Sequence, residues 1–524
     1  MPALLAIDAG TTGITALVVD HDARVRARGY AEFEQHYPAD GQVEHDLGQM
    51  WAATLEATRA AVDAYAAAGS PAGDLVAVGV TNQRETACLW DRETLGSPRR
   101  AIVWQDRRTA ALCESMREDG YEPLVAERTG LRLDPYFTAT KLAWVRANDP
   151  HTWAGVESGR IAIGTVDSYL VARMSRGLYH VTDATNASRT LLYDLSTGAW
   201  SERLCALFGV PSAALPEVTA SYGQIARTDP SAFCGLDLPI TGIAGDQQAA
   251  LVGQAGFTAG DAKCTYGTGS FLLVHTGDRI RHSAHGLLTT VALAHPDGRR
   301  DFALEGSVFV TGAAVQWLRD GLGIIASAGE VEALAASVPD SGGVVFVPAL
   351  TGLGAPDWDP TARGLVIGIT RATTAAHLAR ATLEAIALQV KDVVDLMGRE
   401  ADVTTGVQMP ELSIIVEPAH DDGPILVQLT YKIEPAEREA FLRVIHDMEP
   451  IRRRNGATSW RVFRDLEQDG CFVERFIIDS YAEYMRSRAR MTQSDREVQD
   501  AVNRLQRADT PIRISRLIGV EPDE

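Results

Sequence analysis

Apolar residues near the start of the chain form two short runs on either side of a small polar corner. The stretch LLAIDAGTTGITALVVD, residues 4–20, predicts a strand over Leu4–Ile7, a Gly/Thr corner and a second strand over Ile14–Val19. The corner glycines tolerate backbone conformations that a Cβ would forbid, and backbone N–H groups there can form a nest for an anion. The pattern fits a phosphate site, and equally an ordinary hairpin with a glycine turn.

The same pattern returns far downstream in KCTYGTGSFLLVHTGD, residues 263–278. A Thr/Gly corner at Thr265–Ser270 leads into an apolar strand over Phe271–His275. Two such hairpins suggest an internal duplication, in which two related halves face one nucleotide across a cleft.

Between the two hairpins, strand patterns alternate with helical patterns, which is typical of an α/β domain. Residues 45–68 predict an amphipathic helix that Asp46 caps, and Ile240–Ala244 predicts a buried strand. A long helix is expected over His377–Met397. After it the chain becomes polar and similar to a linker, and a compact strand–helix–strand–strand–helix pattern follows over residues 425–505.

Composition narrows the classes of partner. A chain of 524 residues is expected to hold about three domains or more. The net charge of −20 argues against nucleic acid or an anionic membrane as the main partner. The chain has no run of about 18 apolar residues, so no membrane span is expected, and no signal peptide is expected before the first strand. The six cysteines are scattered and are expected to be reduced. We therefore expect a cytoplasmic enzyme.

Two carboxylates are candidates for chemistry. Asp246 follows the predicted strand Ile240–Ala244, at the carboxyl end where ligands gather in open α/β sheets. It could accept a proton from a substrate hydroxyl, although an N-cap of the helix Gln247–Val252 is the interpretation that local sequence favours. Asp8 lies at the first corner, where a carboxylate would repel phosphate unless a cation such as Mg²⁺ lay between them.

Other polar and aromatic residues could hold a small polar substrate. Arg84 and Glu85 are adjacent at a predicted strand end and could bind a polyol, or could form a surface pair of little energetic weight. Tyr136 and Trp104 could line the site, although packing is the commoner role for such residues. Gly312 would let backbone approach a nucleoside or would only permit close helix packing.

These residues lie in motifs that resemble the FGGY family of carbohydrate kinases, and within it the members that phosphorylate glycerol. The resemblance covers residues from about 4 to 397. The motifs fall in family order and include DAGTTG (8–13), GVTNQRET (79–86), AIVWQDRRTA (101–110), GIAGDQQAALVGQ (242–254), YGTGSFLLVHTG (266–277) and ALEGSVFVTGAAVQWLRD (303–320). The resemblance implies ATP-dependent phosphorylation of glycerol to sn-glycerol 3-phosphate, on an actin-like, ribonuclease H-like fold of two lobes.

The resemblance also implies a role for each matching residue. Asp246 would be the catalytic base and, with Asp8, would bind Mg²⁺. The glycerol-binding set would be Arg84, Glu85, Tyr136, Asp246 and Gln247, with Trp104 and Phe271 against the carbon chain. The ATP-binding set would be Thr11, Thr12, Gly13, Thr268, Gly312 and Gln316.

The part of the chain after residue 397 departs from the family. No Asp-Gly-Gly corner follows the long helix, so the second lobe is expected to be truncated and to lack the surface that holds the adenosine of ATP. Residues from about 415 to 505 resemble instead the soluble C-terminal appendage of major-facilitator exporters, a monooxygenase-like α+β barrel whose role would be dimerisation or a small-molecule pocket.

The expected organisation is a first kinase domain at 1–250, a truncated second domain at 256–400, a linker at 401–414 and a ferredoxin-like α+β domain at 415–524. Its partners would be glycerol and ATP, in a homo-oligomer without a membrane span. A catalytically inactive scaffold that binds or dimerises is the alternative.

Overall fold

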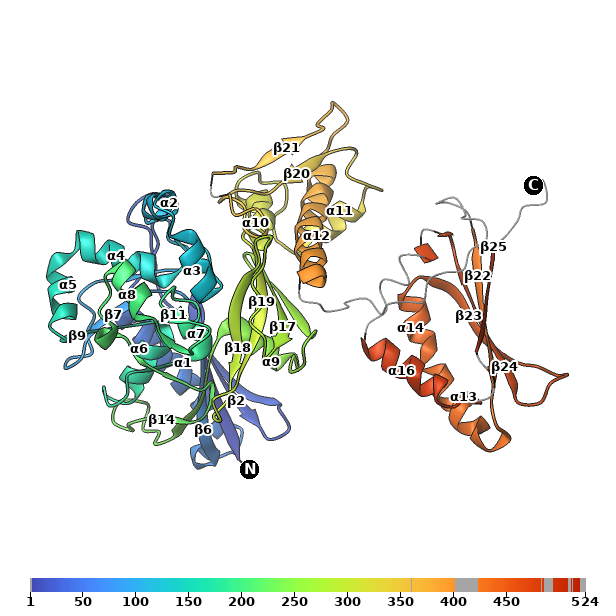
Figure 1. Cartoon of the computed structure of the whole chain (residues 1–524), viewed down its shortest axis with the longest axis horizontal. Coiled ribbons are helices and arrows are strands. Elements are labelled where there is room, and N and C mark those ends of the chain that lie inside the picture. Colours follow the sequence, from blue (N-terminus) through green and yellow to red (C-terminus); the bar gives the residue numbers. More distant parts are fainter. Residues whose placement is uncertain are drawn as a thin grey trace. The chain divides into compact units, whose positions relative to one another are not determined.

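The computed structural model describes residues 2–359, 361–400, 423–481, 483–484, 493–507, 510 and 512–518. The chain divides into two compact units, Met1–Ala401 and Asp402–Glu524, coloured blue to orange and orange-red in Figure 1. The predicted linker at 401–414 lies outside the described residues.

The first lobe of unit 1 is built on a six-stranded sheet with the order β14-β15-β6-β1-β2-β3. The strands β1, β2 and β3 are antiparallel neighbours, whereas β6 runs parallel to β1, and β15 parallel to β6. Their bounds are β1 Ala3–Ala9, β2 Gly13–Asp20, β3 Val25–Glu32, β6 Leu75–Asn82, β14 Tyr222–Arg227 and β15 Pro239–Gly245. The predicted first hairpin and the strand before Asp246 are therefore confirmed.

Helix α1 (Leu47–Ala67) packs against β2 and β3. The carboxylate of Asp46 accepts hydrogen bonds from the backbone N–H groups of Gly48 and Gln49, at 2.7 and 3.0 Å, so the predicted cap is confirmed. Gly29 of β3 permits this packing, because a Cβ there would lie 1.9 Å from the carbonyl oxygen of Ala57.

Smaller elements complete the first lobe. The helices are α2 Ala110–Glu118, α3 Glu122–Thr129, α4 Thr138–Asn148, α5 Pro150–Glu157, α6 Val166–Met174, α7 Ala184–Ala187 and α8 Glu202–Phe208. The short strands are β4 Gln35–His36, β5 Glu44–His45, β7 Cys88–Asp91, β8 Ala101–Ile102, β9 Ile161–Gly164, β10 Val181–Asp183, β11 Tyr193–Asp194, β12 Ala199–Trp200 and β13 Glu217–Thr219.

The second lobe of unit 1 has a four-stranded antiparallel sheet with the order β16-β17-β19-β18. The predicted second hairpin is confirmed as β16–β17. The bounds are α9 Asp246–Gly253, β16 Ala262–Tyr266, β17 Ser270–Gly277, β18 Leu288–Ala294, β19 Arg300–Val308, α10 Gly312–Asp320, α11 Glu330–Ala336, β20 Val345–Val347, β21 Leu365–Ile367 and α12 Ala375–Glu400.

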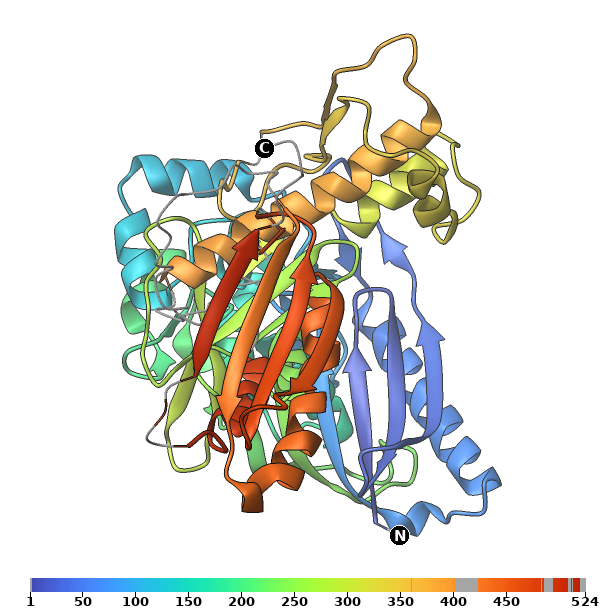
Figure 2. The same cartoon turned by 90° about the vertical axis from the view of Figure 1, so that its right-hand side faces the viewer.

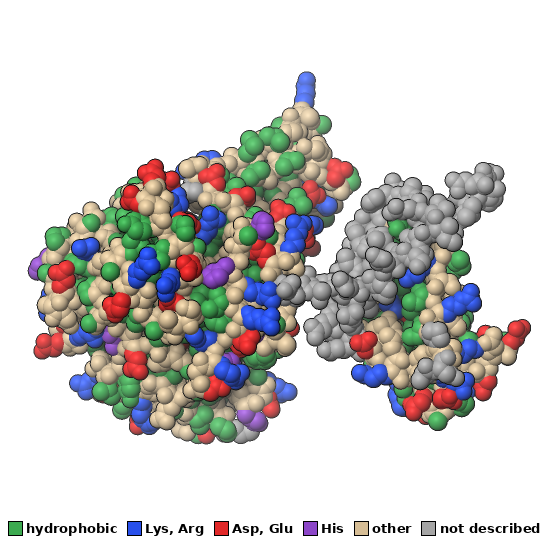
Figure 3. Space-filling view, in the orientation of Figure 1, with side chains coloured by type: hydrophobic (Ala, Val, Ile, Leu, Met, Phe, Trp, Pro, Cys, Tyr) green, Lys and Arg blue, Asp and Glu red, His purple; other side chains and the backbone are tan. Residues whose placement is uncertain are grey.

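The two hairpins occupy different places in their sheets. In the first lobe β1 lies between β2 and the parallel strand β6, whereas among the described residues β16 pairs with β17 alone. Strand β16 is thus the edge of its sheet. An exposed apolar surface lies on the β20–β21 hairpin, where Val345, Leu365 and Ile367 are each 51% exposed, and Figure 3 shows hydrophobic side chains gathered there.

Unit 2 is an antiparallel sheet, seen face on in Figure 2, with the strand order β23-β24-β22-β25. Its elements are β22 Ile425–Lys432, α13 Arg438–His446, α14 Met448–Arg454, β23 Ala457–Arg464, β24 Cys471–Ile478, α16 Gln493–Asn503 and β25 Arg513–Ile518. The predicted strand–helix–strand–strand–helix order is confirmed. The core of the unit joins the helices to the sheet through Tyr431, Phe441, Ile445, Phe472 and Val502.

Candidate active site

Arg84 and Glu85 lie just beyond the carboxyl end of β6 and are almost completely buried, at 2% and 1% exposure. The interpretation of this pair as a weak surface ion pair is therefore wrong. Arg84 makes a two-pronged ion pair with Glu305 of β19, in the second lobe, at 2.6 and 3.0 Å. Its Nη1 also donates to Oε1 of Gln248 at 3.2 Å. Arg84 thus connects the two lobes.

Glu305 also accepts a hydrogen bond from Arg189, at 2.8 Å, and Arg189 donates in turn to Glu85 at 2.7 Å. Burial by itself would raise the pKa of Glu305, but the charges of Arg189 and Arg84 outweigh it and lower that pKa to about 2. The result is a buried cluster of two cations and two anions, in which Arg189 Nη1 has no hydrogen-bond partner among the described residues.

Glu85 has a left-handed backbone conformation, with φ of 63°. Such a conformation costs about 1–3 kcal/mol for a residue with a side chain, so the surroundings must enforce it. The backbone carbonyl of Glu85 accepts a hydrogen bond from Thr138 Oγ1 at 3.0 Å, and the side chain is held by Arg189. Burial raises the pKa of the Glu85 carboxyl.

Asp246 is the first residue of α9, and the N-cap position belongs to Gly245. The capping interpretation is therefore wrong. Both carboxylate oxygens accept hydrogen bonds from Gln247, one from its backbone N–H at 2.7 Å and one from its side-chain amide at 3.1 Å. The carboxylate also lies 3.4 Å from Arg84 Nε, yet its side chain remains 37% exposed. It is oriented by its neighbours and still accessible.

Three aromatic rings lie beside these groups. Trp104 makes edge contacts with Tyr136 and with Phe271 of β17, with ring centroids 5.7 and 6.0 Å apart. Tyr136 is buried, as the packing interpretation expects, but its hydroxyl also lies 3.4 Å from Arg84 Nη2. The rings form an apolar wall to which both lobes contribute, next to Arg84.

The first hairpin corner is closed by a hydrogen bond from Gly10 N–H to the Gly13 carbonyl, at 3.1 Å. The hydroxyl of Thr11 accepts from Trp104 Nε1 at 3.0 Å, which leaves its own proton available to another acceptor. Thr12 is exposed. At Gly13 a Cβ would lie 2.8 Å from the Ala31 carbonyl oxygen, so β3 approaches too closely for a side chain.

The second corner is joined to the start of α10. The carbonyl of Thr268 accepts from the N–H groups of Thr311 and Ala313, and that of Gly267 accepts from Gly312 at 2.9 Å. A Cβ on Gly312 would lie 2.5 Å from the Gly267 oxygen, so close packing does require glycine here. Gln316 lies one turn along α10 and is exposed. The structure therefore brings Thr268 and Gly312 together, with Gln316 one helical turn further along α10.

Asp8 is at the end of β1 and is open to solvent. The protein around it still desolvates the carboxyl, and together with the charge of Asp246 this raises the pKa of Asp8 to about 6. Mg²⁺ is commonly bound through one or two carboxylates, with phosphate and water completing its shell. The pair Asp8 and Asp246 fits that pattern, and the described residues contain no larger cluster of His, Cys, Asp and Glu suited to a metal.

A cavity of about 730 Å³ opens beside the aromatic wall. Trp104, Thr268 and Phe271 line it, as do Arg107 of the first lobe and Phe309 of the second. The Arg107 guanidinium lies over the Phe309 ring, 4.9 Å from its centroid. The cavity is large enough for a small organic ligand.

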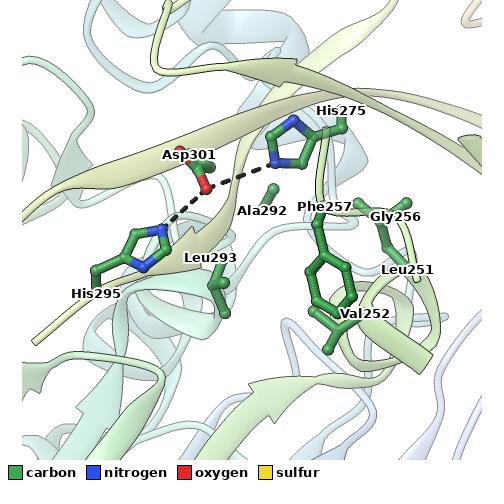
Figure 4. Close-up of a pocket in the computed structure, with 9 residues that line it drawn as sticks. All are labelled: Leu251, Val252, Gly256, Phe257, His275, Ala292, Leu293, His295 and Asp301. Carbon is green, nitrogen blue, oxygen red and sulfur yellow. Dashed lines mark hydrogen bonds and ion pairs between the residues drawn. The ribbon is translucent and has the colours of Figure 1, made fainter. Parts of the chain in front are cut away.

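A much smaller cavity, of about 70 Å³, lies between α9 and strands β17–β19. Figure 4 shows His275 and His295 on either side of Asp301, with Phe257 and Leu251 on the apolar wall. His295 Nε2 is 2.9 Å and His275 Nε2 3.6 Å from the same Asp301 oxygen. This cavity contains none of the residues that the sequence singled out.

Sequence reasoning missed four polar residues that surround the site: Arg189, Gln248, Lys263 and Glu305. All four are buried. Glu305 stands inside the motif at 303–320, but local sequence indicates no partner for it or for Arg189, because their contacts join positions 104 to 221 residues apart. Lys263 begins the second hairpin stretch, but no local pattern there indicates its buried partners.

Comparisons with known proteins identify the family of the chain. The family models of the N-terminal and C-terminal domains of FGGY carbohydrate kinases match residues 3–253 and 262–415. A glycerol kinase of Methylibium petroleiphilum is 51% identical over 416 residues, which are 79% of this chain and 82% of the relative. A glycerol kinase of Rhodospirillum centenum is 54% identical over 396 residues, which are 76% and 78% of the two chains.

Among solved structures, Plasmodium falciparum glycerol kinase with ADP superposes with a TM-score of 0.70 and 33% identity, over 77% of this chain and 80% of that one. Xylulose kinase from Lactobacillus acidophilus shares the fold, with a TM-score of 0.66 and 20% identity over 76% and 78% of the two chains. The fold of unit 1 is thus the actin-like two-domain fold of these kinases. The chain belongs to the FGGY family of carbohydrate kinases, and its kinase region belongs with the glycerol kinases of that family.

A third family model, described as a transmembrane secretion effector, matches residues 344–523 and overlaps the end of the kinase match. In the part of the chain that the structure describes, no helix combines the length and apolar character that a bilayer crossing requires.

Proposed function

We propose that the chain transfers the γ-phosphoryl group of ATP to glycerol and forms sn-glycerol 3-phosphate. The observation that carries this proposal is Asp246, a carboxylate that Gln247 orients, that stays 37% exposed, and that lies 3.4 Å from a buried arginine. Curated relatives about half identical in sequence are named glycerol kinases.

On this proposal glycerol lies between the polar groups and the aromatic wall. Arg84, Glu85, Tyr136 and Gln247 would bind its hydroxyls, while Trp104 and Phe271 would cover its carbon chain. Asp246 would take the proton from the hydroxyl that attacks the γ-phosphate. Arg84 and Glu85 are fixed by buried contacts before any substrate arrives, which reduces the entropy lost on binding.

The two hairpin corners would hold ATP from opposite lobes. Thr11, Thr12 and Gly13 would donate to the phosphates from one side and Thr268 from the other, with Gly312 and Gln316 near the nucleoside. Mg²⁺, held by Asp8 and Asp246, would neutralise phosphate charge during the transfer. The chemistry would then depend mostly on positioning and on electrostatics.

The test is a coupled assay of the purified chain with Mg-ATP and glycerol, with formation of sn-glycerol 3-phosphate as the expected result. Turnover of a pentulose or hexulose in place of glycerol would move the chain to another branch of the family. Calorimetric titration with ATP separates binding from chemistry.

A catalytically inactive scaffold is the second candidate, and the position of β16, which pairs with β17 alone among the described residues, favours it. In the first lobe, β1 occupies the place that β16 has in the second, and β1 has a parallel neighbour, β6, which follows helix α1 in the chain. In the second lobe the chain instead leaves unit 1 directly after helix α12. We therefore infer a truncated second lobe with a weakened nucleoside site. Absence of ATP binding at millimolar concentration would support the scaffold.

For unit 2 we propose a ferredoxin-like α+β domain, similar to the monooxygenase-like appendage of exporters. The strand order β23-β24-β22-β25, with helices between β22 and β23 and between β24 and β25, supports this assignment. Its role would be to make the chain a homo-oligomer. The ATP-dependent chemistry proposed for unit 1 favours the cytoplasm. Light scattering of the purified chain tests the oligomer.

A further inference from the structure

Lys263 is a buried lysine of β16 to which neither the motifs nor the proposed glycerol contacts give a role. Its side chain is 7% exposed, and Nζ donates to Oε1 of Gln247, to Thr265 Oγ1 at 3.0 Å and to the backbone carbonyl of Phe271 at 3.1 Å. An ammonium group has three protons, and each has an acceptor here.

The contact with Gln247 determines how that amide is oriented. Because Nζ can only donate, the Gln247 carbonyl oxygen must face Lys263, and the NH₂ group must face away from it. That NH₂ group donates to Asp246 Oδ2 at 3.1 Å, while the Gln247 backbone N–H donates to Oδ1. A flipped amide would instead place its oxygen against the carboxylate, which is repulsive.

We propose that Lys263 is a positioning residue of the phosphoryl-transfer site, which acts through Gln247 to fix the plane of the Asp246 carboxylate. The same ammonium holds the backbone of Phe271, whose ring contacts Trp104. One lysine thus supports both the proposed base and the apolar wall. This inference rests on the proposed function, because it assigns Asp246 to the reaction.

The charges around Lys263 are consistent with a protonated amine at neutral pH. Burial lowers its pKa to about 8, against the effects of Glu305 and Asp246, which raise it, while Arg84 lowers it further. Since this value lies above 7, most molecules carry the three-proton form that the three acceptors require.

The test compares Lys263→Met, which keeps the length of the side chain but removes every donor, with the wild-type chain. Loss of a group that orients a catalytic ligand typically costs about 10–100-fold in activity, and we expect that loss in kcat together with a higher glycerol KM. The ATP KM should stay within about twofold. Lys391→Met, on the exposed face of α12, is the matched control and should behave as wild type.

A double-mutant cycle distinguishes positioning from a general structural role. If Lys263 acts through Gln247, then Lys263→Met should lower kcat less than about threefold in a chain that already carries Gln247→Ala. The proposal would be overturned if the two replacements lowered kcat independently, so that the loss in the double variant equalled the product of the two single losses. A Lys263→Met enzyme with a kcat within about threefold of wild type would also overturn it. If Lys263→Met does not fold, as judged by circular dichroism, the cycle is run with Lys263→Gln, which leaves a polar group in the site.

The wild-type chain tests the proposed function separately. If it binds glycerol but does not turn it over, the proposed activity fails, and the cycle is then measured on the glycerol Kd by calorimetry, with the same non-additivity expected. A wild-type chain that neither turns over nor binds glycerol overturns both the proposed function and this assignment.

Discussion

Arg84 of the first lobe and Glu305 of the second form a two-pronged ion pair, at 2.6 and 3.0 Å, between side chains that are 2% and 0% exposed. A buried ion pair of this kind stabilises the fold little more than a well-packed apolar pair would. Removing one partner nevertheless destabilises the fold strongly, because the other charge then stays buried without a counter-charge. The orientation of Arg84 therefore depends on how the second lobe is docked against the first.

Replacement of Glu305 by Gln should destabilise the protein at neutral pH and matter less in acid. Because the pKa of Glu305 is lowered to about 2 in the folded state, its contribution to stability is complete above its ordinary pKa of 4.5. It is lost progressively as the pH falls from about 4.5 toward 2. We expect Glu305→Gln to cost about 3 kcal/mol at pH 7.

Urea unfolding of unit 1 at pH 7 and at pH 3 measures this difference. The gap in unfolding free energy between wild type and Glu305→Gln should narrow at the lower pH. A gap that stays constant between the two values would mean that folding does not lower the pKa of Glu305.

Asp246→Asn should lower kcat about 10²–10⁴-fold, the usual scale for removal of a general base. The amide keeps the shape of the carboxylate, so the glycerol KM should change far less. Steady-state kinetics with glycerol and Mg-ATP measure both constants. A variant within about threefold of wild type, under conditions where the chemical step limits the rate, would remove Asp246 from the base role.

Arg84→Ala should chiefly raise the glycerol KM, because its contacts with a bound polyol would exist before the reaction begins. The structure adds a second effect. Glu305 loses one of its two arginine partners, so stability should fall by about 3 kcal/mol or more. Kinetics and thermal unfolding of the same preparation give both quantities, and an unchanged KM would exclude Arg84 from the substrate site.

Gly312→Ala should weaken ATP binding without removing glycerol binding. The new Cβ would lie 2.5 Å from the Gly267 carbonyl oxygen, so the start of α10 must move away from the second corner. Gly329→Ala is the control, because that glycine has a φ of −66° and a Cβ there meets no atom within 4 Å. Calorimetric titration with ATP compares the two, and equal affinities would separate Gly312 from the nucleotide site.

Unit 2 should fold without the kinase region. Its core joins α13 and α16 to the sheet through side chains of its own, and all four strands pair within the unit. Residues 415–524 expressed alone should give a dispersed NMR spectrum and a cooperative unfolding transition. A spectrum typical of a disordered chain would show that the unit needs the rest of the protein.

The sequence by itself determined the local elements. Both hairpins, the helix capped by Asp46, the strand before Asp246 and the element order of unit 2 follow from short patterns of apolar residues, glycines and caps, and the structure has them all. These features depend on neighbours in sequence, so sequence reasoning could find them. The motifs likewise indicated the family.

Only the tertiary structure decided what surrounds the candidate site. Asp246 is not a cap and Arg84–Glu85 is not a surface pair, because β15, β6 and β19 bring residues from distant positions into one buried cluster. The roles of Glu305, Arg189 and Lys263 depend on partners that no local pattern specifies. A charge is tolerated in the interior only where another chain segment supplies its counter-charge or its hydrogen-bond acceptors, and the folding of the whole unit alone determines which segment that is.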